Sequence, residues 1–441
     1  MERNENSNRR LFFRYVIPSV LSFALSGIYA IVDGFFVGNS IGDAGLSAIN
    51  IAYPITAAIQ ATGTGIGMGG AVRYSVLSAA GDERKAMKYS AMSVWLMILL
   101  SIAISLSVLL SSSGLISMLG AEGLLLELGN EYIRIIAAGA ALQIFSTGLV
   151  PFMRNYGGAF WAMAAMICGF IANITLDYAF VWVMGLGMTG AALATVIGQG
   201  LTMVAAITYC ALKRKLTVRI EAEDVRETAV HILRIGLAPF GLALAPNISL
   251  VIVNRFSSYY GGEKAIAAYA CISYIIWILY LILQGVGDGS QPLMSIFYGE
   301  NDSRSLNEVK RLAYETAIAL SLIGAAIILA GRERIGILFG SSDDVNSEIS
   351  AAMPIFLATM PFAAITRIAA AAFYATEKST VSYVLAFIEP VLMLALMLIL
   401  PPLCGGQRMV WWCTALSGIL TSIISMLLSS EYGRRLKGRR A

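Results

Sequence analysis

Charge is scarce in this chain. Only 13% of its 441 residues are charged, whereas 58% are hydrophobic, and the mean hydropathy is +0.74. Soluble globular domains have about 25% charged and about 45–50% apolar residues. So little charge cannot cover the surfaces of the roughly two or three soluble domains that this length would otherwise suggest. The composition therefore indicates an integral membrane protein.

Histidine and paired cysteines are also missing. The chain has one histidine, His231, and five cysteines that stand singly, so no CxxC spacing exists. A zinc site, a disulfide framework and a Ser-His-Asp or HExxH centre are therefore not expected, and the chain is predicted not to be an enzyme. The net charge of +4 comes from basic residues in short loops and at both ends, so nucleic acid is not an expected partner.

Long apolar stretches fill most of the chain. A helix that crosses a bilayer needs about 20 mostly apolar residues, because the hydrocarbon core is about 30 Å thick. Reading for such stretches predicts about twelve transmembrane helices in an all-α fold. Their expected limits are 12–38, 46–76, 89–111, 131–152, 159–184, 188–211, 232–257, 265–297, 311–331, 349–374, 379–401 and 409–430.

The loops between these stretches differ in charge. With the N-terminus placed inside the cell, the inside segments and the two ends carry roughly 22 lysines and arginines, against about six in the outside segments. Cytoplasmic loops carry the excess of positive charge. An odd number of spans would remove this asymmetry. We therefore expect a multi-pass protein of the cell (inner) membrane with both termini in the cytoplasm.

The longest charged stretch, 212–231, divides the chain nearly in half. It separates an N-lobe, 1–211, from a C-lobe, 232–441. A shift of about 221 residues lays Pro18 over Pro239, and a shift of about 220 lays the glycine run 65–69 over the run 285–289. Six spans per half give both halves the same orientation. Such parallel repeats predict a substrate pathway between two six-helix bundles.

Two glycine motifs suggest enzymes but lie in the wrong context. The sequence Gly65-x-Gly67-x-x-Gly70 matches a dinucleotide fingerprint, yet it lies inside a membrane span, where small residues serve helix packing. No Walker-type lysine follows it, so direct ATP drive is not expected.

The second motif is the GxGD sequence 285–288. It resembles the catalytic motif of GxGD-type intramembrane aspartyl proteases, which need a second aspartate in a Tyr-Asp context. Here Asp177 precedes Tyr178 instead. The protease is therefore a remote alternative.

Five ionisable residues of the predicted spans are candidates for a functional role. Each costs about 2.5–3.5 kcal/mol at the bilayer centre, and such residues mark substrate or ion pathways by default. They are Asp33, Asp177, Asp288, Arg367 and Glu389. Asn173 precedes Asp177 by one helical turn, so their side chains share a face. Their oxygens suit a hard cation such as Na⁺ or a transported proton. Asp33 and Thr195 are candidates to complete this site from other helices, although spacing alone does not bring them together.

The C-lobe has a polar set of its own. Arg367 is expected to pair with one of the two acids, Asp288 or Glu389, because an unpaired guanidinium in a span is costly. The other acid would remain free to attract a cationic substrate into the cavity. Asp288 is the favoured anchor, since its counterpart in the N-lobe repeat is Met68 and the repeat does not demand a charge there.

Several segments together resemble the multidrug and toxic compound extrusion (MATE) family over nearly the whole chain. The segments are 32–38, 173–178, 187–195 and 284–293. The resemblance implies two six-helix bundles in a V-shaped, alternating-access antiporter. It would act as a monomer in the lipid bilayer and export amphipathic, cationic small molecules in exchange for Na⁺ or H⁺, with no other cofactor.

The resemblance also assigns residues. It is closer to the DinF-type, MepA-like branch, in which Asp33, Asn173, Asp177 and Thr195 would form the coupling-ion site, and Na⁺, if used, would bind there. Pro18 matches a proline at which the first helix bends. Tyr29 lies one turn before Asp33 and joins Asp288, Arg367 and Glu389 as substrate or cavity candidates.

The chain departs from the NorM-type branch, because the acid which that branch keeps on the seventh helix is absent from 246–256. A flippase for a lipid-linked precursor stays open as an alternative. That function would be expected to show a strongly basic cavity and extra spans.

Overall fold

The computed structural model describes residues 5–215, 217–219, 224–338 and 341–438, and this part of the chain contains helices and no strand. Apolar stretches of this length become helices because a bilayer offers no partner to backbone N–H and C=O groups, so each segment must satisfy its own. The elements are α1 Glu5–Ile41, α2 Asp43–Ala79, α3 Glu83–Met118, α4 Gly123–Ala138, α5 Ala140–Asn155, α6 Ala159–Asp177, the π-helix η1 Tyr178–Val183, α7 Gly187–Leu212, α8 Val225–Gly299, α9 Ser303–Leu338, α10 Asp343–Leu357, α11 Met360–Ala375, α12 Ser379–Cys404 and α13 Gln407–Gly438.

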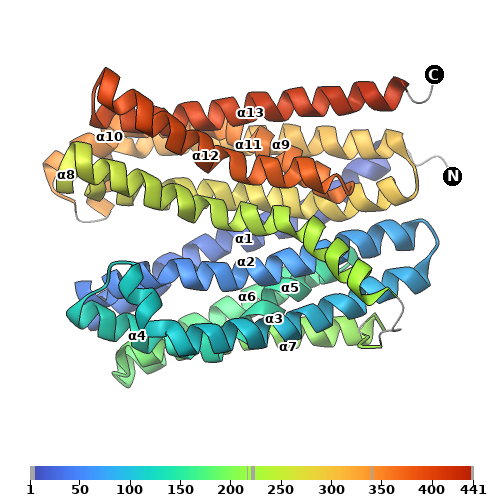
Figure 1. The fold of residues 1–441 in the computed structure, drawn as a ribbon, viewed down its shortest axis with the longest axis horizontal. Helices are drawn as coiled ribbons and strands as arrows, with labels where there is room; N and C mark the ends of the chain where they lie inside the picture. Colours follow the sequence, from blue (N-terminus) through green and yellow to red (C-terminus); the bar gives the residue numbers. More distant parts are fainter. Residues whose placement is uncertain (1–4, 216, 220–223, 339–340, 439–441) are drawn as a thin grey trace.

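These helices make twelve crossings. Eight are long and apolar enough to span a membrane on their own, and two bent pairs, α4 with α5 (59°) and α10 with α11 (44°), each form one more. The 75-residue α8 is two crossings, because its backbone leaves the helical region at Gly262 (φ 64°, ψ −157°) and the two halves run side by side in opposite directions (Figure 1). The 37-residue α2 is the remaining crossing and brings the total to twelve. The predicted count and the all-α fold are confirmed.

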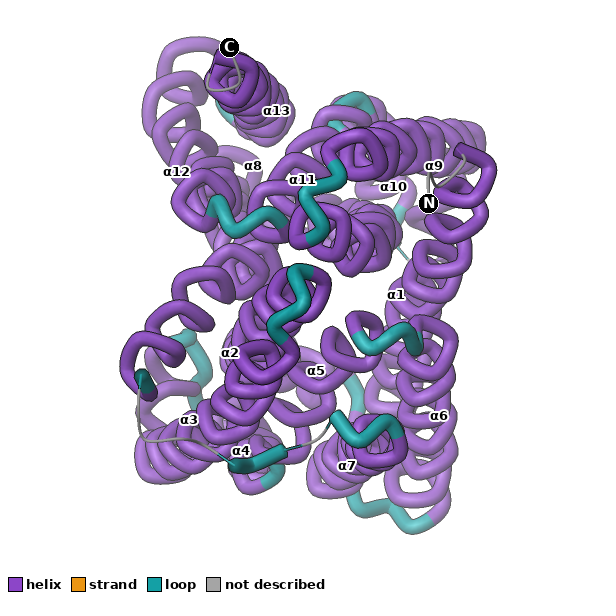
Figure 2. Tube along the Cα trace, turned by 90° about the vertical axis from the view of Figure 1, so that its right-hand side faces the viewer, coloured by secondary structure: helices purple, strands orange, loops and turns teal. Residues whose placement is uncertain are grey.

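The helices form two bundles. Figure 2 shows α2 to α7 gathered in one group and α8 to α13 in the other, with α1 running along both. We call α1–α7 the N-lobe and α8–α13 the C-lobe. Buried side chains between Val37 and Cys210, joined by Ile232 of α8, form the core of the N-lobe, and those between Val253 and Cys413 form a core in the C-lobe. A third buried cluster, which includes Phe12, Met68 and Leu293, joins the two lobes.

Both chain ends lie at the same end of the bundle (Figure 1). We call this end the terminal side and the opposite end the distal side. An even number of crossings requires this arrangement. Helix α7 ends at Leu212 and α8 begins at Val225, so the segment that joins the lobes is shorter than the predicted 212–231 and lies on the terminal side. Residues 216 and 220–223 of that segment are outside the described part.

Glycines allow the two lobes to pack closely in the terminal half of their helices. A Cβ on Gly69 of α2 would overlap the carbonyl oxygen of Ile232 in α8, and one on Gly289 of α8 would lie 2.8 Å from the Cα of Val16 in α1. The two glycine runs that align in the sequence repeat therefore both allow close approach of helix backbones, each across the lobe interface. This close approach agrees with the interpretation of the first run as a helix-packing motif.

Candidate functional site

The four residues of the predicted coupling site meet inside the N-lobe. Asn173 and Asp177 lie one turn apart on α6 and are 2% and 0% exposed. The side-chain amide of Asn173 donates a hydrogen bond of 3.4 Å to the hydroxyl of Thr195 on α7. Asp33 on α1 brings its carboxyl group against that of Asp177. Three helices thus place two acids, an amide and a hydroxyl in one buried cluster, which we call the N-lobe cluster.

Four oxygen atoms of this cluster receive no hydrogen bond from the part of the chain that the structure describes. Both carboxyl oxygens of Asp177, one of Asp33 and the amide oxygen of Asn173 are buried without a donor among the described residues. Buried polar atoms in proteins are nearly always paired, so four such oxygens in one place require an explanation. Two carboxyl groups in contact need a shared proton or a cation between them. The donor set, all oxygen, fits a hard cation such as Na⁺ as well as a proton.

Two tyrosines complete the cluster. The hydroxyl groups of Tyr29 on α1 and Tyr132 on α4 both interact with the side chain of Thr195. Tyr29 was a predicted cavity residue, and its ring stacks on Phe170 of α6 with 5.0 Å between ring centres. Tyr132 was not predicted. Its local sequence offers no signal, because one tyrosine in an apolar helix is ordinary, and only the packing of α4 on α7 brings it to the site.

A π-helix directly follows the cluster. Helix α6 changes to the π-helix η1 immediately after Asp177. On it, Tyr178 and Trp182 pack edge-on against Phe36 of α1, and Trp182 also stacks on Phe35. Short π-helical stretches are rare and often lie at functional sites. This aromatic contact ties α1 to the end of α6 on the distal side of the two acids.

The C-lobe candidates form a chain of contacts. Arg367 of α11 lies over the ring of Tyr280 with its guanidinium carbon 4.7 Å from the ring centre, and it donates a hydrogen bond of 3.4 Å to Gln284. The carboxyl group of Glu389 interacts with both Arg367 and the hydroxyl of Tyr280. Asp288 and Arg367 line one small cavity, whose walls are Pro239, Leu242, Leu283, Gln284, Gly287, Ala371 and Tyr374.

Asp288 differs from its expected role as the unpaired acid. One carboxyl oxygen lies 3.5 Å from a guanidinium nitrogen of Arg154, and the other accepts a hydrogen bond of 3.3 Å from the hydroxyl of Tyr374. Arg154 belongs to α5 in the N-lobe, so this ion pair crosses the lobe interface. Arg154 follows the predicted span 131–152 and was therefore expected in a loop, but it is only 3% exposed. The last turn of α5 carries it into the interface.

Further polar contacts cross the interface on the terminal side. Arg73 of α2 binds both carboxyl oxygens of Glu377 at 2.6 and 2.8 Å. The amide of Asn155, next to Arg154, donates to Gln291 of α8 at 2.9 Å. Pro18, the predicted hinge, lies in the terminal half of α1, where the hydroxyl of Ser22 donates to its carbonyl oxygen at 2.7 Å. Whether α1 bends there stays a prediction.

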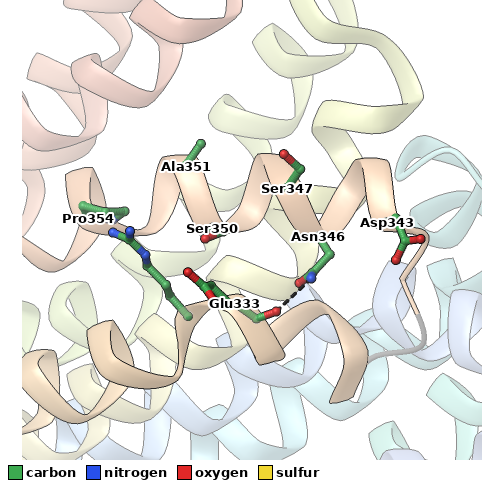
Figure 3. A pocket seen from close by; sticks show the side chains of 8 residues that line it. Glu333, Asp343, Asn346, Ser347, Ser350, Ala351 and Pro354 are labelled. Atoms are coloured by element: carbon green, nitrogen blue, oxygen red, sulfur yellow. Dashed lines mark hydrogen bonds between the residues drawn. The ribbon is translucent and has the colours of Figure 1, made fainter.

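A polar groove lies on the distal side, away from the lobe interface. Figure 3 shows its lining on two neighbouring helices, with Glu333 on α9 and Asp343, Asn346 and Ser350 on α10. The side-chain amide of Asn346 donates to the carbonyl oxygen of Glu333 at 2.8 Å. No residue of the N-lobe lines this groove.

A family model described as MatE matches residues 18–179 and again residues 239–399. The two matches cover well over half of the chain. The chain belongs to the MatE family. The second match starts where the sequence repeat places it, since Pro18 aligns with Pro239. One match falls in each lobe, so the MatE fold here consists of two related halves, and the resemblance predicted from the sequence is confirmed.

Similar proteins cover nearly the same length. The multidrug export protein MepA of Staphylococcus saprophyticus is 24% identical over 401 residues, 90% of this chain and 88% of that protein. MepA of Staphylococcus aureus strain NCTC 8325 is 24% identical over 405 residues, 91% of this chain and 89% of that protein. Like these members of the MatE family, the chain is a multi-pass membrane protein.

Solved structures share the fold. A MOP superfamily transporter from Pyrococcus furiosus superposes with a TM-score of 0.91 at 24% identity and covers 98% of this chain and 97% of its own. A multidrug resistance MATE family transporter in an outward-facing conformation superposes with a TM-score of 0.90 at the same identity and coverage. The twelve-helix, two-bundle MatE architecture is thereby confirmed.

Proposed function

We propose that this protein is a secondary active antiporter which exports amphipathic, cationic small molecules in exchange for Na⁺ or H⁺ by alternating access. The single observation that carries the proposal is the N-lobe cluster, in which two buried carboxyl groups touch and four oxygens have no donor. Such a site binds a proton or a hard cation.

The position of the cluster links ion binding to movement of the lobes. Asp33 belongs to α1, which packs on α6 in the N-lobe and on α8 in the C-lobe. When an ion or proton enters between Asp33 and Asp177, it changes the attraction between α1 and α6. Antiport needs the ion and the substrate to favour different states, and a site on a helix shared by both lobes meets that need.

The relatives support the substrate class. The MepA proteins of two staphylococci carry the name multidrug export protein and align over about nine-tenths of this chain. The acidic character of the N-lobe cluster favours positively charged substrates and coupling ions. We further propose that the terminal side faces the cytoplasm across the cell (inner) membrane and that one copy of the chain transports on its own.

Two alternative functions, a flippase for a lipid-linked precursor and a GxGD-type protease, have less support. A lipid-precursor flippase would be expected to have a strongly basic cavity, whereas the N-lobe cluster is acidic. A GxGD-type protease needs a second aspartate facing Asp288, but the carboxyl group of Asp288 faces Arg154 and Tyr374.

The test is transport of ethidium, a permanent amphipathic cation, by protein in liposomes under an imposed proton or Na⁺ gradient. We expect at least one gradient to drive ethidium movement, and Asp177→Asn and Asp33→Asn each to abolish most of it. The exposed acid Asp344 offers a matched control, and Asp344→Asn should transport at the parent rate. Parent-rate transport by Asp177→Asn across both gradients would remove the N-lobe cluster from coupling.

A further inference from the structure

The ion pair between Arg154 and Asp288 is buried at the lobe interface. The side chain of Arg154 is 4% exposed and that of Asp288 is 10% exposed, and the two charges come from different lobes. Arg154 has little else to bind, since its other neighbours are the sulfur of Met166 at 3.9 Å and the ring of Phe23 at 5.4 Å. Removal of one partner from a buried pair leaves an uncompensated charge, which is strongly unfavourable.

Alternating access would part these two charges. Helices α5 and α8 belong to opposite lobes, so opening of the terminal side pulls Arg154 away from Asp288. The acid would then keep the hydroxyl of Tyr374 and the side-chain amide of Gln284 as partners, but both are neutral and do not replace a charge. Opening therefore needs another cation at Asp288, or it leaves a buried carboxylate uncompensated.

The surroundings of Asp288 suit an organic cation. The acid lines the small C-lobe cavity whose walls include the apolar side chains of Pro239, Leu242 and Ala371. The closed cavity is too small for an organic cation, so these surfaces can pack against the body of an amphipathic molecule only when the lobes have parted, with its positive charge at the carboxylate. The nearest competing cation of the C-lobe, Arg367, is already engaged by the ring of Tyr280 and by Gln284.

We propose that Asp288 exchanges counter-ions during transport. While the terminal side is closed, the partner of Asp288 is Arg154. While the terminal side is open, its partner is the positive charge of the substrate. When the lobes close again, Arg154 returns to Asp288 and displaces the substrate cation. The inference rests on the proposed export function. It gives Asp288 two roles. With Arg154 it forms the ion pair that holds the terminal side closed, which we call the lock, and it is also the anchor for the substrate.

The two partners of this pair should then behave differently. Arg154→Gln removes only the lock, so it raises the population of the open state and tightens binding of any substrate. Asp288→Asn removes the lock and the anchor together. We expect it to tighten binding of neutral chloramphenicol and to weaken binding of the permanent cation tetraphenylphosphonium, by about ten-fold, as when a charge loses its counter-ion.

The second interface pair supplies the matched control. Arg73 and Glu377 also join the lobes, but neither lines the C-lobe cavity. Arg73→Gln and Glu377→Gln should therefore shift the binding of both probes in the same direction and by similar factors. Binding is measured at equilibrium on full-length protein in nanodiscs. Opening is measured as the distance between spin labels at exposed positions Ala80 and Asn307 on the terminal side.

The reversed pair, Arg154→Asp with Asp288→Arg, covers the case in which single variants do not fold. It should restore the short distance between the labels and still lose tetraphenylphosphonium binding by about ten-fold. Recovery of that binding by the reversed pair, or equal shifts of both probes in Asp288→Asn, would overturn the anchor role. An unchanged label distance in Arg154→Gln would overturn the lock. None of these results depends on Asp177, so failure of ion coupling is recognised separately.

Discussion

At the scale of residues, this protein has charged side chains buried inside its membrane-spanning helices, where such residues are rare. The N-lobe cluster places two acids in contact without a donor, and the C-lobe places Arg367 between Glu389 and Gln284. The first arrangement is incomplete and calls for an ion. The second has partners for its charge. This difference supports the proposals that the N-lobe cluster binds the coupling ion and that the C-lobe binds the substrate.

A prediction at this scale concerns Thr195. Its hydroxyl accepts from Asn173 and contacts two tyrosines, but it carries no charge. A neutral hydrogen bond contributes about 1 kcal/mol, so Thr195→Ala should raise the coupling-ion concentration at half-maximal transport by about five-fold without abolishing transport. Ion titration of ethidium transport measures this. Thr208→Ala, on the exposed face of the same helix, should have no effect. Complete loss of transport in Thr195→Ala would contradict a minor role.

At the scale of helices, glycine decides how closely the lobes approach. At Gly69 of α2 and Gly289 of α8, a methyl group would meet backbone atoms of the other lobe or of α1. The helices themselves would tolerate alanine well, because alanine favours helix more than glycine does. The glycines are therefore a feature of the interface and not of the helix.

We predict that Gly69→Ala weakens closure of the terminal side. The added methyl group must displace the carbonyl of Ile232, and overpacking of this kind costs about 1–3 kcal/mol. The expected results are a lower thermal unfolding temperature in detergent and a longer distance between labels at positions 80 and 307. Gly114→Ala on α3, where a Cβ meets nothing within 4 Å, is the control and should be neutral or stabilising. A normal label distance in Gly69→Ala would show that the interface adapts.

At the scale of the whole molecule, an even number of crossings puts both ends on one side (Figure 1). The excess of lysine and arginine in the segments on that side predicts that it faces the cytoplasm. The lobe contacts through Arg73, Arg154 and the glycines all lie in the same half. The ion pairs and the close helix contacts therefore close the terminal side, which is the side from which we propose that substrates enter.

The orientation is tested by cysteine labelling. Single cysteines at positions 42, 122 and 342, in a background without the five native cysteines, should react with an impermeant reagent in intact cells. Cysteines at positions 84 and 219 should react only after the cells are opened. Reaction of position 219 in intact cells would reverse the proposed orientation.

The sequence by itself determined the class, the number of crossings and the division into two halves. These depend on local properties, namely the length of each apolar stretch, the charge of each loop and the spacing of glycines. The sequence also predicts the members of the coupling site, in part from i, i+4 spacing on α6 and in part from family resemblance. They are Asp33, Asn173, Asp177 and Thr195. Only the structure shows that these four residues lie together, because spacing within one helix does not determine the position of another helix.

Only the tertiary structure decided the partners of the charges. Arg154 and Asp288 are separated by 134 positions and belong to different lobes, so no local pattern pairs them. Tyr132 joins the N-lobe cluster for the same reason. The bend between α4 and α5, the π-helix after Asp177 and the lobe interface all arise from packing between helices. Hydrophobic length sets where a helix crosses the bilayer, but the fit of side chains between helices determines which charges meet.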